Sequence, residues 1–310
     1  MAIDTATKTQ IANAIKADFQ RRRNIDSDYS QTRHATWLSI NNAVYSSIAK
    51  GDYDKKLKNT EWLRLAMQLN IDTTGHNWKT ANTHTYEYVT AQLGFCQDNG
   101  VGRILCDEKG LGKTRAAEAY ALENGNVAYI KCGSFPTRHL LIREIARQFG
   151  LDNIGTVHEV RMSMIAEIRA MQHPIIILDD GGYLSNEAWM EVKALYDELP
   201  YQCAWYVIGD MGLKKKIEGL VRHGRIGYES LMDRFGGGFK QITGECTSDA
   251  ELAMFKSGQL KAVLEVNEPK LPKAQQKELI ARCKNSLRLL QDEVIKYRHI
   301  NKTPSNAHLA

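Results

Sequence analysis

The 310-residue chain lacks the features of a membrane-inserted or secreted protein. No apolar run approaches the roughly 18 residues that a membrane span needs. The first residues, MAIDTATKTQIANAIK, have no apolar stretch of the kind that forms the centre of a signal peptide. We therefore expect a cytoplasmic protein with no membrane partner.

Paired cysteines are also absent, because the six cysteines are scattered and none forms a CxxC pair. This spacing argues against a zinc site and against a disulfide framework, and favours buried free thiols. Internal repeats and low-complexity segments are absent too. The cysteines are Cys96, Cys106, Cys132, Cys203, Cys246 and Cys283.

Positive charge is present in modest excess but is unevenly distributed. The formal net charge is +5, and basic residues gather at 21–23, at 214–216 and in the last forty residues. Such runs usually form solvated surfaces, but several in one chain raise the probability of a polyanionic partner.

The pattern of apolar residues divides the chain into four parts. Residues 1–70 are predicted to form short helices, and the polar, aperiodic residues 71–85 a linker. Residues 86–245 alternate helices with apolar runs, and residues 246–310 return to helix with a basic tail. The apolar runs GRILC, NVAYIK, PIIILD and AWYVIG predict short strands buried on both faces, with FKQI as a last strand. The predicted fold class is α/β, with a parallel sheet.

The N-terminal part resembles a helix-turn-helix. Ser30 can cap one short helix, and Asn41 or Asn42 can cap a second that ends at Gly51. The polar face of such a helix can enter a major groove, although a small bundle for protein contacts is the alternative. The residues expected on that face are Asn42, Tyr45, Ser46 and Lys50.

The segment DEKGLGKT predicts a phosphate-binding loop between a strand and a helix. Gly112, Lys113 and Thr114 match the end of the pattern GxxxxGK[ST], but Asp107 stands where the first glycine is usual. Backbone N–H groups of such a loop face phosphates, the lysine reaches the outer phosphates and the hydroxyl binds Mg²⁺. The residues predicted to bind ATP here are Asp107, Glu108, Lys109, Gly110, Leu111, Gly112, Lys113, Thr114 and Arg115.

Acidic residues end two further predicted strands. Asp179 is predicted to hold Mg²⁺ together with Thr114, and Asp180 is predicted to orient the attacking water together with Asp210. The carboxyl ends of parallel strands are where open α/β sheets bind ligands. Acidic residues at strand ends also form turns. The prediction therefore depends on three strand ends following one another in the expected order: the phosphate loop, Asp179 and Asp210.

Basic residues further along the chain are predicted to contact phosphates. Arg234 is expected to reach a neighbouring subunit's triphosphate, and Arg288 to sense the γ-phosphate in its own subunit. Ordinary surface arginines are the alternative. The candidate DNA contacts in this part are Lys214, Lys215, Lys216 and Arg225.

This ordered set of motifs resembles AAA+ ATPases, and more narrowly the MuB family of target-selection ATPases of Mu-like phages. The resemblance rests on GLGKTRAAEAY, IIILDDGGYL, VIGD and SLMDRFG, and covers most of the chain. It implies a P-loop core with a helix-turn-helix unit and a C-terminal helical lid. It also implies ATP-dependent assembly of a helical filament on double-stranded DNA with little sequence preference, and recruitment and stimulation of a transposase.

Four positions depart from that family's pattern, one of them Gly182, where the family has an acid. Asp107 replaces glycine, Asp180 replaces the catalytic glutamate, and Asp210 replaces asparagine. A carboxylate about 4 Å from a phosphate would weaken binding by a few kcal/mol, unless the side chain of Asp107 points to solvent. Asp180 is one methylene short, so slow hydrolysis of ATP to ADP and phosphate is expected at best. The rival hypotheses are a non-hydrolysing nucleotide-binding scaffold, a helicase-loader-type ATPase and a plain repressor.

Overall fold

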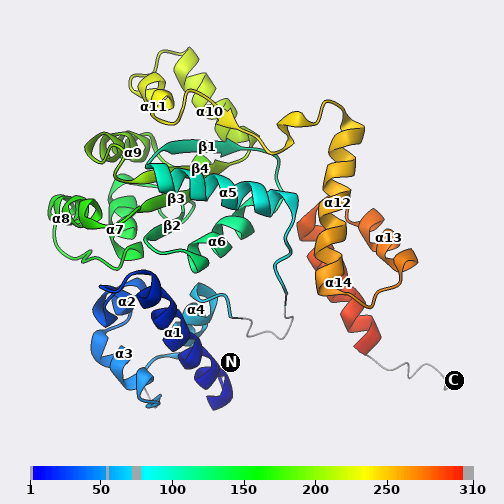
Figure 1. Cartoon of the computed structure of the whole chain (residues 1–310), viewed down its shortest axis with the longest axis horizontal. Coiled ribbons are helices and arrows are strands. Elements are labelled where there is room, and N and C mark those ends of the chain that lie inside the picture. The colour runs from blue at the N-terminus through cyan, green and yellow to red at the C-terminus, as the bar shows by residue number, and fades with distance from the viewer. Residues whose placement is uncertain (1–2, 54–55, 72–77, 303–310) are drawn as a thin grey trace.

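Five parallel strands form the central sheet in the order β2-β3-β4-β1-β5 (Figure 1). The computed structural model describes residues 3–53, 56–71 and 78–302. The α/β fold class and all predicted strands are confirmed, although only two residues of FKQI are extended. The strands are β1 (Gly102–Cys106), β2 (Val127–Lys131), β3 (Ile175–Asp179), β4 (Ala204–Gly209) and β5 (Phe239–Lys240).

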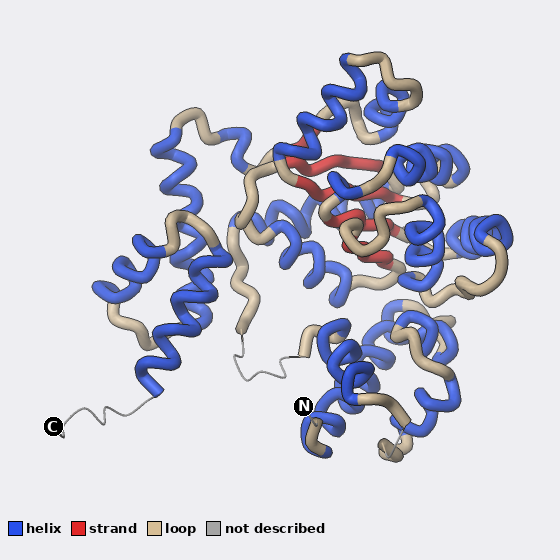
Figure 2. Tube along the Cα trace, turned by 180° about the vertical axis from the view of Figure 1, so that it is seen from behind, coloured by secondary structure: helices blue, strands red, loops and turns tan. Residues whose placement is uncertain are grey.

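Helices cover both faces of this sheet, which explains why its strands are almost continuously apolar (Figure 2). Helices α5 (His84–Asn99) and α6 (Lys113–Glu123) pack on one face. The other face carries α7 (Arg138–Gln148), α8 (Val157–Ala170), α9 (Asn186–Glu198), α10 (Met211–Arg222) and α11 (Tyr228–Arg234).

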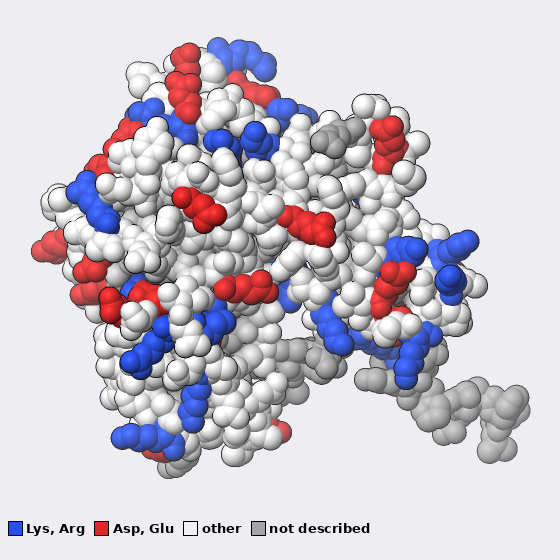
Figure 3. Space-filling view, in the orientation of Figure 1, with Lys and Arg blue, Asp and Glu red and all other residues white. Residues whose placement is uncertain are grey.

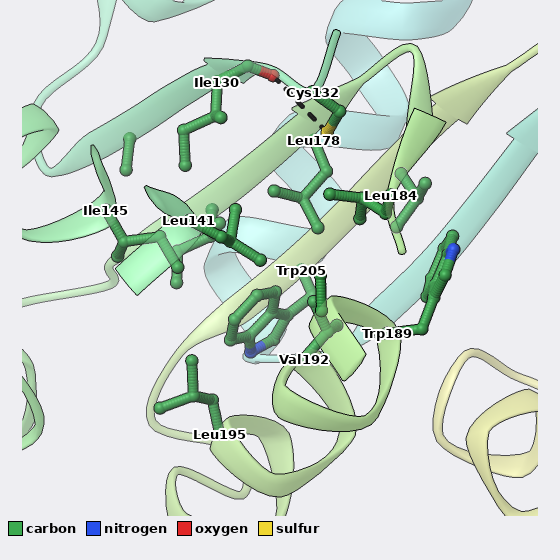
Figure 4. Packing of buried hydrophobic residues seen from close by; sticks show 14 of the residues in the cluster. Ile130, Cys132, Leu141, Ile145, Leu178, Leu184, Trp189, Val192, Leu195 and Trp205 are labelled. Atoms are coloured by element: carbon green, nitrogen blue, oxygen red, sulfur yellow. Dashed lines mark hydrogen bonds between the residues drawn. The ribbon is translucent and has the colours of Figure 1, made fainter. Parts of the chain in front are cut away.

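The larger hydrophobic core lies between the sheet and α7–α11. Figure 4 shows Trp205 of β4 packed against Val192 and Leu195 of α9. Leu178 of β3 lies in the same layer, and Leu141 of α7 is fully buried there. Because this core fixes the strands in register, their carboxyl ends are held in line.

The N-terminal residues form a separate helical unit with its own hydrophobic cluster. It consists of α1 (Thr5–Ile25), α2 (Gln31–Trp37), α3 (Asn42–Ala49) and α4 (Asn59–Gln68). Ser30 caps α2 and Asn41 caps α3, so the choice left open between Asn41 and Asn42 is decided for Asn41. Ile11, Leu38 and Trp62 are fully buried in this cluster.

The N-terminal unit docks on α7 of the core through polar contacts. The indole N–H of Trp37 donates to Gln148 at 3.1 Å, and Arg147 donates to the Trp37 carbonyl at 2.6 Å. Gly150 passes so close to the Arg33 carbonyl that a Cβ there would lie 2.5 Å from its oxygen. Glycine at this position therefore permits the two units to approach closely.

Three C-terminal helices form the lid: α12 (Asp249–Asn267), α13 (Lys273–Arg282) and α14 (Leu287–Lys302). Residues 78–83, which fall within the expected linker, pack against this lid, with Trp78 and Ala81 in its hydrophobic cluster. Residues 72–77 of that linker and 303–310 of the basic tail lie outside the described residues. In the part of the chain that the structure describes, no helix is both apolar enough and long enough to cross a bilayer.

Candidate nucleotide-binding site

The phosphate loop lies at the edge of the sheet where three strands end side by side. The order β3-β4-β1 brings Asp179 at the end of β3, Asp210 after β4 and the loop after β1 to one edge. A cavity of about 970 Å³ opens there. Seven of the predicted loop residues, from Lys109 to Arg115, line it.

Lys113 is buried at the floor of the loop. Its ammonium group donates to the carbonyl oxygens of Asp107 and Glu108, both at 2.7 Å. Burial lowers the pKa of Lys113 because the charged form has lost its water. A phosphate in the cavity would give this ammonium an anionic partner in place of two neutral carbonyls.

The loop is built to bring backbone N–H groups close to a ligand. Gly110 and Gly112 adopt positive φ angles of 79° and 93°, which favour glycine. Gly112 precedes α6 without a side-chain cap, so the first turn of that helix opens onto the cavity. These features fit a polyphosphate, since helix N-termini and turns of this kind attract anions.

The side chain of Asp107 does not take either orientation expected from the sequence. It faces neither a phosphate nor solvent but is fully buried. Its carboxylate accepts hydrogen bonds from the backbone N–H groups of Ile242 and Thr243 at 2.5 and 2.7 Å. The side chain of Glu108 also points away and pairs with Lys256 of α12. Neither side chain therefore faces the cavity, and the binding of ATP at these two positions, whose carbonyls receive Lys113, stays a prediction that concerns the backbone.

Thr114 and Asp179 lie together as the metal prediction requires. Asp179 is 2% exposed, and it accepts hydrogen bonds from Thr114 and from the Tyr129 hydroxyl, the latter at 2.7 Å. Burial raises the pKa of Asp179, while these hydrogen bonds favour its ionised form. A hydroxyl and a carboxylate are oxygen ligands of the type that Mg²⁺ prefers, so the pair fits that ion.

Asp180 and Asp210 line the same cavity from different sides. Asp180 is exposed and has a left-handed backbone, with φ 56° and ψ 43°. Asp210 caps α10 by accepting from the N–H groups of Gly212 and Leu213 at 2.8 and 3.1 Å. Although its partial burial acts in the opposite direction, the hydrogen bond from Lys109 lowers the pKa of Asp210. Asp180 is the less constrained of these two carboxylates.

Arg288 comes to the cavity from the lid. It lies in the first turn of α14 and lines the cavity with its neighbour Leu287. The N–H of Leu287 points to the Gly110 carbonyl at 3.4 Å, a long hydrogen bond. The lid therefore touches the phosphate loop directly.

Arg234 lies away from the cavity of its own subunit. Its guanidinium pairs with Asp197 of α9 and donates to the Ser230 hydroxyl at 2.6 Å. Its carbonyl lies beside Gly102, the first residue of β1, whereas the phosphate loop follows the last. It therefore does not line the cavity of its own subunit, and a role across a subunit boundary stays a prediction.

Sequence reasoning missed one wall of the cavity, which comes from the N-terminal unit and the segment after it. Met67, Asn70 and Trp78 line this wall. Arg115 joins it to α6 by donating to the Asn70 side chain at 2.8 Å and to the Thr80 hydroxyl at 2.9 Å. No local pattern signals this wall, since it depends on how the units pack.

Burial contradicts the DNA contact predicted for Tyr45, and Lys216 has partners within the protein although its predicted DNA contact stays untested. Tyr45 is 4% exposed and its hydroxyl bonds to the imidazole of buried His34 at 2.9 Å. Lys216 is half-buried and donates to the carbonyl oxygens of Gly182 and Leu184, both at 2.9 Å. Lys216 thus braces the turn that follows Asp180.

The other candidate contacts are at least partly accessible. Lys50, Lys215, Asn42 and Arg225 are exposed, and Ser46 and Lys214 are half-buried. In Figure 3, basic side chains gather over the N-terminal unit and over the lid, while acidic side chains cross the middle of the view. Accessible basic groups meet one requirement for phosphate contacts, and DNA binding stays a prediction.

Comparison with protein families agrees with this geometry. Residues 103–217 match the family model described as an AAA domain, a stretch that runs from β1 into α10. A comparison with curated proteins gives no significant match. The sheet order and the phosphate loop agree with this match and support an AAA-type P-loop core over residues 103–217.

Proposed function

We propose that the protein is an ATP-dependent switch that assembles on double-stranded DNA and regulates transposition by recruiting a transposase. The observation that supports a switch is the composition of the cavity wall. The core supplies Lys113, the lid supplies Arg288 and the N-terminal unit supplies Asn70. Because all three parts meet at the nucleotide, its binding and loss change the contacts of each.

The residues have separate tasks in this proposal. The loop N–H groups and Lys113 bind the phosphates, and Thr114 with Asp179 holds Mg²⁺, which would neutralise phosphate charge. Asp180 accepts a hydrogen bond from the attacking water and orients it. Arg234 of a neighbouring subunit completes the site, so hydrolysis depends on self-association into a helical oligomer.

The DNA and transposition parts of the proposal draw on the accessible basic groups and on the resemblance to the MuB family. Phosphate contacts by Lys50, Lys215 and Arg225 are independent of base sequence. We expect binding to weaken steeply as salt rises, because counterions are released from DNA.

Electron microscopy of the protein on DNA tests the proposal, with ATP, with ADP and without nucleotide. Regular decoration of the DNA is expected only with ATP, and Lys113→Ala is expected to abolish it. Arg143→Ala is the matched control, since Arg143 of α7 donates to the carbonyl oxygens of Asn153 and Gly155 and neither lines the cavity nor pairs with a partner of Arg234. Equal decoration in all three nucleotide states would refute the switch.

The short side chain of Asp180 favours a second candidate, a nucleotide-binding scaffold that does not hydrolyse ATP. Asp180 is exposed and left-handed at φ 56°, and its side chain is one methylene shorter than the glutamate of the family that the chain resembles. Phosphate release measured on DNA-bound protein separates the two. Release above that of Asp180→Asn favours the ATPase, and equal release favours the scaffold.

A further inference from the structure

The first position of the phosphate loop is bonded to the segment that leads into the lid. We call residues 241–248, between β5 and α12, the hinge segment. The Asp107 carboxylate accepts from Ile242 N–H at 2.5 Å and Thr243 N–H at 2.7 Å on one oxygen. The other oxygen accepts from the Thr243 hydroxyl at 2.6 Å and from Glu108 N–H at 2.7 Å.

Three of these four donors belong to the hinge segment, and this decides what the carboxylate does. A buried charge is stable only while it is fully hydrogen-bonded. Asp107 is fully buried, so a hinge movement that removed Ile242 and Thr243 would leave its carboxylate with one of its four donors, Glu108 N–H. A glycine at position 107 would instead leave two hinge N–H groups without this acceptor.

Neighbouring loop residues make further contacts with the lid. Glu108 pairs with Lys256 of α12, and the Gly110 carbonyl receives Leu287 N–H at 3.4 Å. The loop thus contacts the hinge segment, the first lid helix and the last lid helix. On the side of the phosphate loop that faces the cavity, Lys113 and the loop N–H groups are the groups that can contact a ligand.

We propose that Asp107 is a positioning residue that fixes the hinge segment to the phosphate loop and so holds Arg288 of the lid beside the nucleotide. It does not act as a charge that repels phosphate. The proposal rests on nucleotide binding at this site for its effect on affinity. The contact between Asp107 and the hinge can be tested without nucleotide.

Cys246 provides a native probe of the hinge segment. It is partly exposed, whereas the other five cysteines are buried. Because Cys246 lies in the hinge segment close to Thr243, loosening of this segment is expected to raise its rate of modification by a maleimide under native conditions. Labelling of the Cys246→Ser variant shows how much of the total maleimide modification occurs at Cys246.

The test compares Asp107→Asn, which keeps one carbonyl acceptor, with Asp107→Gly, which keeps none. Since a hydrogen bond to a charged group is lost, Cys246 labelling is expected to accelerate about tenfold in Asp107→Asn and further in Asp107→Gly. Thr243→Val removes one donor only and is expected to lie between wild type and Asp107→Asn. If Asp107→Gly does not fold, the other two variants still decide the question.

Asp18→Asn is the matched control, because Asp18 is a buried carboxylate of the N-terminal unit that accepts from Arg22 and His34. It is expected to leave Cys246 labelling unchanged. Labelling of Asp107→Asn and Asp107→Gly at the wild-type rate would overturn the proposal.

Titration calorimetry with ATP and Mg²⁺ then separates positioning from repulsion, because the two predict opposite signs. Positioning predicts that ATP binds about tenfold more weakly to Asp107→Asn, since the lid is no longer held in place. Unchanged or tighter binding would overturn the proposal. If wild type does not bind ATP, the proposed function fails, and the labelling experiment still reports on the hinge contact.

Discussion

Replacing Asp180 by glutamate is expected to speed ATP hydrolysis. The substitution extends the carboxylate by one carbon–carbon bond, about 1.5 Å. Asp180 lines the cavity and is exposed, so the longer side chain has room to extend. Because a misplacement of about 1 Å can lower a rate ~100-fold, the gain in kcat is expected to approach 100-fold.

The backbone at this position limits the gain. Asp180 has φ 56°, a left-handed conformation that aspartate tolerates better than glutamate does. The turn is tightly packed, since Gly181 lies so close to Val207 that a Cβ at position 181 would be 2.6 Å from the valine side chain. The backbone therefore has little room to relax around a glutamate at position 180. Glutamate is therefore expected to lower the free energy of unfolding by about 1 kcal/mol, which is less than the expected gain in transition-state stabilisation.

The assay is steady-state phosphate release with DNA and Mg²⁺ at saturating ATP. Asp180→Asn is the matched control, since it keeps the size of the side chain and removes its charge. The role of Asp180 in orienting water would be contradicted if Asp180→Glu hydrolysed ATP no faster than wild type while binding it equally well.

Three further outcomes are expected. Lys113→Ala should lower the affinity for ATP about a hundredfold or more in calorimetry. The reason is that a charge pair at 4 Å is worth about 4 kcal/mol at an effective dielectric of 20. Equal affinity of the variant and wild type would contradict the site. Tyr129→Phe should weaken ATP binding about tenfold with Mg²⁺ but little without it, because Asp179 loses a hydrogen bond that favours its ionised form. An equal loss of ATP affinity with and without Mg²⁺ would contradict the metal site. Burial lowers the pKa of His34 below 6.5, so the unfolded state binds the extra proton first and stability should fall as pH drops below 6.5. Urea midpoints should show this decline in wild type, and His34→Gln should reduce it; an unchanged decline would contradict the assignment to His34.

The sheet and the site acids could be predicted from sequence because their signals are local. Runs such as IIILD are apolar throughout since both faces of their strand are covered. The loop residues Gly112 to Thr114 are adjacent in the chain, and Asp179 follows a buried strand. The order of these motifs along the chain was therefore enough to predict that they lie at one edge of the sheet.

The orientation of single side chains could not be predicted in the same way. Asp107 receives its partners from residues 135 and 136 positions away in sequence, which no local pattern reveals. Tyr45 was assigned to a polar face by helical spacing, but its hydroxyl finds a partner inside, in His34. Lys216 likewise reaches two backbone carbonyls across a turn.

The link from Arg115 to Asn70 and Thr80 has a practical consequence for anyone who dissects this protein. A fragment trimmed to residues 103–217, the stretch that matches the family model, would keep the phosphate loop, Asp179 and Asp210 and still lack one side of the cavity. Nucleotide affinity measured on such a fragment would understate that of the whole chain. The smallest unit that retains the complete binding chamber begins upstream of α4 and extends past the start of α14.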